Sequence, residues 1–156
     1  MRLHFFRHAI AEEARDGKSD HQRELTSEGI ERTRTAARVL KQLRFEPDHL
    51  FSSPLVRARQ TADILAEGLG VAVQVRPEVG PGFNVDAITR LTHNLGDADV
   101  LFVGHEPDFS NTIYAITGGR VLMKKGCLVS VEVDPGPSLR GSLSTIIPPK
   151  VFSRLI

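Results

Sequence analysis

Two arginines and two histidines have the side chains needed to bind and attack a phosphoryl group. Arg7 and His8 follow a short apolar stretch near the N-terminus, and His105 follows the apolar run 100–103. Arg57 lies between them, in the first turn of a predicted helix. A neutral imidazole can attack phosphorus because its unperturbed pKa of about 6.5 leaves a free lone pair near neutral pH. Arginine neutralises phosphoryl oxygens through paired N–H bonds.

These side chains suggest a reaction in two steps. His8 would take the phosphoryl group while Arg7 and Arg57 hold its oxygens. His105 would donate a hydrogen bond as charge develops in the transition state. Water would then attack the phosphohistidine intermediate and release inorganic phosphate. The sequence has no tight cluster of carboxylates that points to a metal, so we expect neither a metal nor any other cofactor.

The elements that must position these residues alternate between strands and helices. Hydrophobic periodicity predicts strands at 2–6, 48–52, 71–75, 99–104 and 128–133. It predicts helices from Ser27 to about Leu43, from a Ser53 cap and Pro54 to Gly68 or Gly70, over 86–95, and from Pro107 to about Thr117, with a polar loop at 16–24. This order predicts a three-layer α/β/α domain with a mostly parallel central sheet. Ligands of such sheets bind beyond the carboxyl ends of the strands, where His8, Arg57 and His105 should meet.

Length and composition narrow the class of protein. The 156 residues suit one domain over 1–156, and 40% hydrophobic with 25% charged residues exclude disordered and fibrous chains. A net charge of +1 gives no global attraction to nucleic acid or to an anionic membrane, so we expect neither as a partner. The single cysteine, Cys127, excludes an internal disulfide and a cysteine-based zinc site. We therefore expect a cytoplasmic protein.

Three spaced motifs resemble those of a known family. They are Arg7-His8 after the first strand, SSPLVRARQTA at 52–62, and VGHEP at 103–107. Together they resemble the histidine phosphatase (phosphoglycerate mutase-like) superfamily, and within it the small SixA-like phosphohistidine phosphatases. The segment RELTSEG at 23–29 is also similar to the stretch that precedes the first helix in those proteins.

The resemblance implies a phosphoglycerate mutase-like fold and a role for each motif residue. His8 is the implied nucleophile, Arg7 and Arg57 bind the phosphoryl group, and His105 completes the phosphate pocket. Ala9 stands where the superfamily usually has glycine, which narrows the pocket floor slightly. The proton donor stays open between Glu78, as in mutase-like members, and Glu106, as in members with an acid directly after the second histidine.

The substrate class predicted from the sequence is phosphohistidine on a signalling or phosphotransfer protein. Between Ala62 and Asp99 the chain has room only for a strand, a loop and one helix, so the site should stay open to a protruding side chain. A protonated imidazole also leaves phosphorus more readily than an alkoxide does, and it demands less of a proton donor. A phosphatase acting on small phosphate esters is the main alternative. A mutase is not expected, because it would have to exclude water from the site to retain the phosphoryl group. A non-catalytic phospho-binding module would not need all four intact site residues.

The remaining histidines, His4, His21, His49 and His93, have no metal-ligand spacing and are interpreted as structural. His21 lies in the polar loop and could rim the pocket. Cys127 is predicted to be a small buried residue. The pair Lys124-Lys125 is too small for nucleic acid, but could steer an acidic partner if it lies near the pocket mouth.

Overall fold

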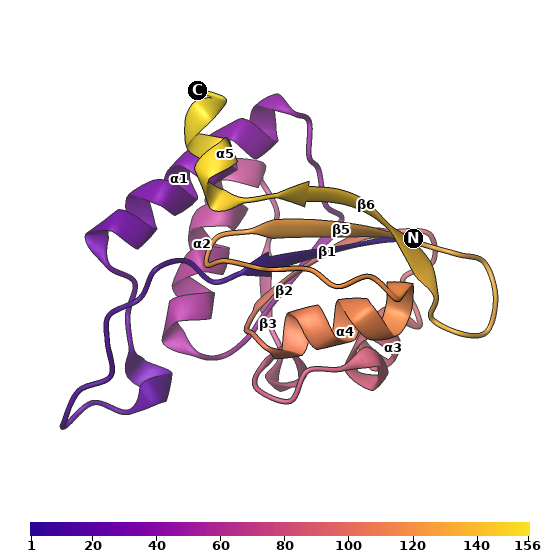
Figure 1. Cartoon of the computed structure of the whole chain (residues 1–156), viewed down its shortest axis with the longest axis horizontal. Coiled ribbons are helices and arrows are strands. Elements are labelled where there is room, and N and C mark those ends of the chain that lie inside the picture. Colours follow the sequence, from indigo (N-terminus) through magenta and orange to yellow (C-terminus); the bar gives the residue numbers. More distant parts are fainter.

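A computed structural model describes residues 1–156 as a six-stranded sheet between two layers of helices (Figure 1). The strands are β1 (Arg2–Arg7), β2 (His49–Ser52), β3 (Val73–Val75), β4 (Asp99–Gly104), β5 (Leu128–Val133) and β6 (Gly141–Ile147). The helices are α1 (Ser27–Gln42), α2 (Val56–Leu69), α3 (Val85–Thr92), α4 (Asp108–Thr117) and α5 (Pro149–Arg154), with short 3₁₀ turns η1 (Asp20–Gln22) and η2 (Pro77–Val79). No helix is long and apolar enough to cross a membrane.

The strand order is β3-β2-β4-β1-β5-β6. The first four strands run parallel to one another, whereas β5 is antiparallel to β1 and β6 is antiparallel to β5. The predicted three-layer fold is therefore confirmed, with a sheet that is mixed at one edge. In register, Arg7 pairs with Gly104 and Ser52 pairs with Val103, so three parallel strands end together.

Alternation along the central strands divides the core between the two faces of the sheet. In β1, Leu3 and Phe5 belong to the cluster that contacts α3 and α4, while Phe6 belongs to the cluster that contacts α1, α2 and α5. The two helical layers lie on opposite sides of the sheet in Figure 1. Because β4 is buried on both faces, its sequence is continuously apolar from Val100 to Val103.

Helix α2 begins later than predicted. Ser53 does not cap it and Pro54 is not its first residue, because the N-cap is Leu55 with extended φ and ψ of −65° and 137°. The Ser53 amide donates to the Val103 carbonyl at 3.0 Å, which continues the sheet beyond β2 and keeps the chain extended. The end of the helix is as predicted: Gly70 has a φ of 74°, a left-handed conformation that glycine adopts without strain.

Two C-terminal elements were not predicted. Strand β6 has no fully buried residue, and its exposure alternates only over its first four residues. The six-residue helix α5 follows Pro148 and contributes Phe152, which packs against the α1 and α2 side of the core. The predicted strand 71–75 is shorter, starting at Val73, and the predicted helix 86–95 covers 85–92.

Candidate active site

The ends of β1, β2 and β4 bring the candidate residues to one edge of the sheet. The His8 amide donates to the Gly104 carbonyl at 3.0 Å, so the chain after β1 lies beside the chain after β4. The ring centroids of His8 and His105 are 5.3 Å apart. His8, Arg57 and His105 are buried, and Arg7 is half-buried. The structure thus places together the residues that the strand-end argument selects.

The hydrogen bonds of His8 determine which ring nitrogen carries its proton. Its Nδ1 lies 2.8 Å from the carbonyl oxygen of Ala9, which can only accept. The proton is therefore on Nδ1, and Nε2 has a free lone pair. Arg57 Nε donates to this Nε2 at 3.4 Å, which is consistent with the same tautomer. His8 presents an unprotonated nitrogen to the centre of the site.

Burial and charge keep both imidazoles neutral. Burial lowers the pKa of His8 to about 3, and the neighbouring cations Arg57 and Arg7 act in the same direction. Burial also lowers the pKa of His105 to about 4, again with Arg57 contributing. Both values lie well below the ordinary imidazole pKa of about 6.5, so both rings are unprotonated at neutral pH.

Ser53 fixes the second histidine. Its Oγ lies 2.7 Å from His105 Nε2 and accepts a hydrogen bond from the Leu55 amide. Donation of the hydroxyl proton to Nε2 would place the ring proton of His105 on Nδ1. This Nδ1 is buried and has no protein partner. A ligand oxygen placed there would accept a hydrogen bond from His105 Nδ1–H, for which the protein has no acceptor.

The guanidinium of Arg57 connects the site to the loop that precedes α1. Its Nη1 donates to the backbone oxygen of Asp20 at 2.8 Å, and its Nη2 lies 3.2 Å from Asp20 Oδ2. Asp20 belongs to η1, which lies within the polar loop predicted at 16–24. Arg57 reaches this loop from the first turn of α2, while its Nε remains directed at His8.

Arg7 is held by the segment between α4 and β5. Its Nη1 donates to the Met123 carbonyl at 2.8 Å, whereas its buried Nε has no protein partner. Burial lowers the pKa of Arg7, and the nearby Glu106 carboxylate opposes that shift. Arginine remains charged at such sites, so an unpaired buried N–H of Arg7 favours an anionic ligand. Lys124 lies in the same segment, and its carbonyl accepts a hydrogen bond from the Cys127 amide.

The two candidate proton donors have different surroundings. Both carboxylate oxygens of Glu106 are engaged by Ser110, one by the amide at 2.8 Å and the other by the hydroxyl. Glu106 thereby provides an acceptor for the Ser110 amide, a backbone donor in the first turn of α4. Glu78 lies in η2, which follows β3 at the same edge of the sheet, and its Oε2 is buried without a hydrogen-bond partner. Only Glu78 has an oxygen free for a ligand.

Sequence reasoning did not identify three of the groups that support the site: Asp20, Ser53 as the partner of His105, and the Met123 carbonyl. Ser53 stands in the motif at 52–62, which was the available signal for it. Asp20 contacts Arg57 across 37 positions, and no spacing rule predicts such a contact. No group of three or more histidine, cysteine, aspartate or glutamate side chains is arranged to hold a metal ion.

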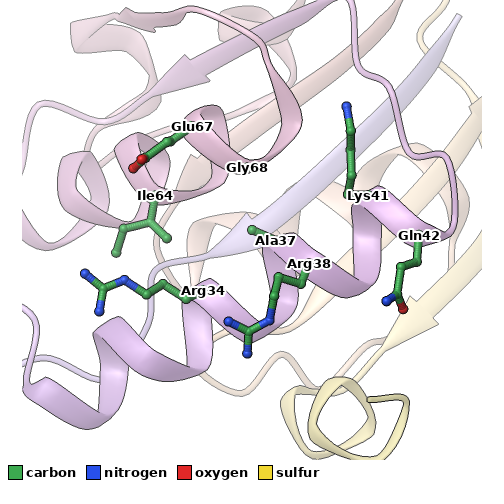
Figure 2. Close-up of a pocket in the computed structure, with 8 residues that line it drawn as sticks. All are labelled: Arg34, Ala37, Arg38, Lys41, Gln42, Ile64, Glu67 and Gly68. Carbon is green, nitrogen blue, oxygen red and sulfur yellow. The ribbon is translucent and has the colours of Figure 1, made fainter.

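A separate hollow of about 530 Å³ lies between α1 and α2 and includes none of these residues. Figure 2 shows Arg34, Arg38 and Lys41 on α1, with Ile64 and Glu67 on α2. The two helices approach closely here, since a Cβ on Gly68 would lie 2.7 Å from the Cβ of Ala37. Arg34 is paired with Glu31 on its own helix, and both side chains are exposed, as in an ordinary surface ion pair.

Comparison with known proteins determines the family. The model of the histidine phosphatase superfamily (branch 1) matches residues 3–80, which include Arg7, His8 and Arg57. The chain belongs to the histidine phosphatase superfamily. Phosphohistidine phosphatase SixA of Escherichia coli is 32% identical over 86% of both chains. An uncharacterized protein of Picosynechococcus is 37% identical over 85% of both chains.

The structural comparison agrees with this assignment. A protein histidine phosphatase SixA solved in complex with tungstate has a TM-score of 0.85 and 27% identity, covering 97% of this chain and 99% of that one. The fold is therefore phosphoglycerate mutase-like, as the motifs implied. As a member of this superfamily, the protein is a phosphatase that acts on a phosphorylated substrate and releases phosphate.

Proposed function

We propose that this phosphatase removes the phosphoryl group from phosphohistidine on a protein, through a phosphoryl intermediate on His8. The observation that carries the proposal is the state of His8. Its Nδ1–H is donated to the Ala9 carbonyl, and its unprotonated Nε2 faces the Arg57 guanidinium. A nucleophile with a free lone pair next to a fixed cation suits attack on a phosphoryl dianion.

The reaction begins when His8 Nε2 forms a bond to phosphorus. The bond between phosphorus and the substrate imidazole breaks, and its electron pair returns to that ring nitrogen. Water then attacks the phosphorus on His8, loses a proton and releases inorganic phosphate, which restores the neutral His8. Two P–N bonds are thus exchanged in the first step, and a P–O bond replaces a P–N bond in the second.

The surrounding donors stabilise the charge on the transferring group. Arg57 and the unpaired Nε of Arg7 bind the phosphoryl oxygens, and His105 donates from Nδ1. Removing buried donors of this kind typically costs two to three orders of magnitude in rate, roughly 3–4 kcal/mol each. Ser53 contributes indirectly, because its hydroxyl holds the proton of His105 on the nitrogen that faces the ligand.

Glu78 is the proposed donor where the leaving group needs a proton. Its free buried Oε2 supports this role, whereas the Glu106 carboxylate is occupied by Ser110. In the hydrolysis step the same Glu78 carboxylate can take the proton of the attacking water. Glu106 instead stabilises the start of α4, next to His105.

The substrate class is supported by the size of the chain and by its relatives. The E. coli relative is itself a phosphohistidine phosphatase, and the SixA structure holds tungstate, a tetrahedral oxyanion with the shape of phosphate. Between α2 and β4 the chain forms only β3, η2 and α3. So short a connection supports a site that accepts a side chain protruding from another protein, because it supplies no inserted subdomain to enclose a small substrate.

The test compares phosphate release from phosphohistidine and phosphoserine peptides of matched sequence, with His8→Ala as control. The proposal expects faster release from phosphohistidine and no release by the variant. Faster release from phosphoserine, still dependent on His8, would assign the protein to phosphate esters instead. Phosphate binding without any release that depends on His8, from peptides or from a folded phosphohistidine protein, would indicate a binding module.

A further inference from the structure

We propose that the Asp20 carboxylate is a specificity-determining residue that accepts the ring N–H of the leaving imidazole. The inference rests on the proposed function and names the group that recognises phosphohistidine within it. Asp20 would distinguish a phosphorylated imidazole from a phosphate ester, because only the imidazole carries an N–H, on the ring nitrogen opposite the one whose bond to phosphorus breaks.

The distance between Asp20 and the nucleophile is set by one guanidinium. Arg57 donates from Nε to His8 Nε2 at 3.4 Å, while its Nη2 lies 3.2 Å from Asp20 Oδ2. A phosphoryl group on His8 would use the same guanidinium, so it would lie directly beside the Asp20 carboxylate. Asp20 is also close enough to His105 to raise the pKa of that ring, against the larger effect of burial.

Asp20 lies on the side of the site where the leaving group must be. Phosphoryl transfer proceeds roughly in line, so the leaving group points away from the attacking nitrogen of His8. His8 is buried, with 5% of its surface exposed. The Asp20 side chain is 58% exposed and the Arg57 side chain 8%, so Asp20 lies on the solvent side of Arg57, from which a substrate would approach.

The carboxylate is held in this position by a second arginine. Arg23 Nε donates to Asp20 Oδ1 at 2.9 Å, and Arg23 Nη1 donates to the Glu12 carbonyl at 2.9 Å. Partial burial of the Asp20 carboxyl raises its pKa, but Arg57 and Arg23 outweigh this effect and lower the pKa overall. Asp20 is therefore ionised and acts as a hydrogen-bond acceptor, with no proton of its own to give.

An ionised acceptor at this place favours the protonated form of phosphohistidine. In that form one ring nitrogen carries phosphorus and the other carries a proton, which Asp20 accepts as a hydrogen bond. When the P–N bond breaks, its electron pair returns to the ring and a neutral imidazole leaves. No proton has to be transferred in this step. A phosphoserine has no such N–H, and its alkoxide leaving group is repelled by the carboxylate.

The decisive variant is Asp20→Asn, which keeps the size of the side chain and removes its charge. Asp63→Asn is the matched control, because Asp63 is also an exposed carboxylate that pairs with an arginine of α2. The measurement is the ratio of kcat/KM for the phosphohistidine peptide to that for the phosphoserine peptide. We expect Asp20→Asn to lower this ratio at least tenfold, and Asp63→Asn to leave it unchanged. An equal effect on both substrates would mean that Asp20 only orients Arg57, which would overturn the proposal.

A binding experiment separates this inference from the proposed function. Imidazole is titrated into protein saturated with inorganic phosphate at pH 6, and its affinity is measured by NMR. We expect Asp20→Asn to weaken imidazole binding at least fivefold relative to wild type and to Asp63→Asn. Equal affinities would overturn the role of Asp20. If the wild-type protein binds imidazole through Asp20 but releases no phosphate from phosphohistidine, the proposed function fails while the recognition by Asp20 stands.

Discussion

Arg57 Nε donates to Nε2 of His8 across 3.4 Å, and this contact joins the end of β1 to the first turn of α2. The same guanidinium reaches Asp20 through both of its terminal nitrogens. Arg57 therefore occupies the centre of the site, between the nucleophile and the loop at the pocket mouth. When His8 carries a phosphoryl group, the phosphoryl oxygens would take over some of the hydrogen bonds that Arg57 now donates to His8 and Asp20.

Arg57→Lys should lower kcat/KM for the phosphohistidine peptide by about 10²-fold, since an ammonium cannot contact His8, Asp20 and a phosphoryl oxygen together. Arg59→Lys is the matched control, because Arg59 lies on the same helix and pairs only with the exposed Asp63. Steady-state kinetics of the two variants provide the check. Comparable rates for Arg57→Lys and wild type would show that phosphate binding does not depend on the planar guanidinium.

Ser53→Ala should lower kcat/KM about tenfold, because His105 loses the hydroxyl that places its proton on Nδ1. Ser52→Ala serves as the control: Ser52 is equally buried, but its hydroxyl donates to a backbone carbonyl and not to the site. Urea unfolding should show a loss of about 1 kcal/mol for either variant. The account is contradicted if the two variants lose activity equally.

The free energy of unfolding should fall as the pH decreases from about 6.5 toward 4. Burial lowers the pKa of His4 to about 4, of His8 to about 3 and of His105 to about 4. The unfolded chain therefore binds more protons than the folded chain in this range, and protonation favours unfolding. Each imidazole contributes a slope of at most about 1.4 kcal/mol per pH unit.

His8→Gln removes one of these titrating groups and provides the check on that slope. Urea unfolding at pH 7.5 and pH 5 should show a smaller loss of stability for His8→Gln than for wild type. His93→Gln, at the exposed histidine that caps the C-terminus of α3, should keep the wild-type loss. The same pH dependence in all three proteins would show that His8 is not held in its neutral form.

Gly104→Ala should destabilise the protein by about 1–3 kcal/mol through overpacking. A Cβ at this position would lie 2.7 Å from Cζ of Phe109 and 3.2 Å from the Val79 carbonyl oxygen. The double variant with Phe109→Leu relieves the first contact, so its cost should be smaller than the sum of the two single costs. Additive costs in chemical denaturation would show that the ring of Phe109 does not restrict residue 104.

The sequence predicts the centre of the fold better than its edge. Strand β4 is buried on both faces and reads as a continuous apolar run, so its limits at Asp99 and Gly104 are predicted correctly. Strand β6 lies at the edge of the sheet and has no fully buried side chain, which leaves little hydrophobic pattern in Gly141–Ile147. Pairing with β5 stabilises it, and this tertiary interaction is not visible in a local pattern.

A similar distinction holds for the site. The meeting of His8, Arg57 and His105 follows from the rule that parallel strands end at one edge, because each residue lies just after a predicted strand or in the first turn of the helix after one. The position of Asp20 depends on how a polar loop folds back over α2, and composition alone does not determine that path. The start of α2 was predicted incorrectly for a related reason: Ser53 bonds to β4 and to His105 instead of capping the helix.

The central claim is that His8 carries the phosphoryl group, and rapid-quench mass spectrometry tests it most directly. The protein is mixed with a phosphohistidine peptide for milliseconds, quenched in alkali, digested and examined for phosphate on the peptide that contains residue 8. The account predicts phosphate on His8 of the wild-type protein, and none on any residue of the His8→Ala variant. Rapid phosphate release without a phosphorylated His8, or equal release by His8→Ala, would contradict it.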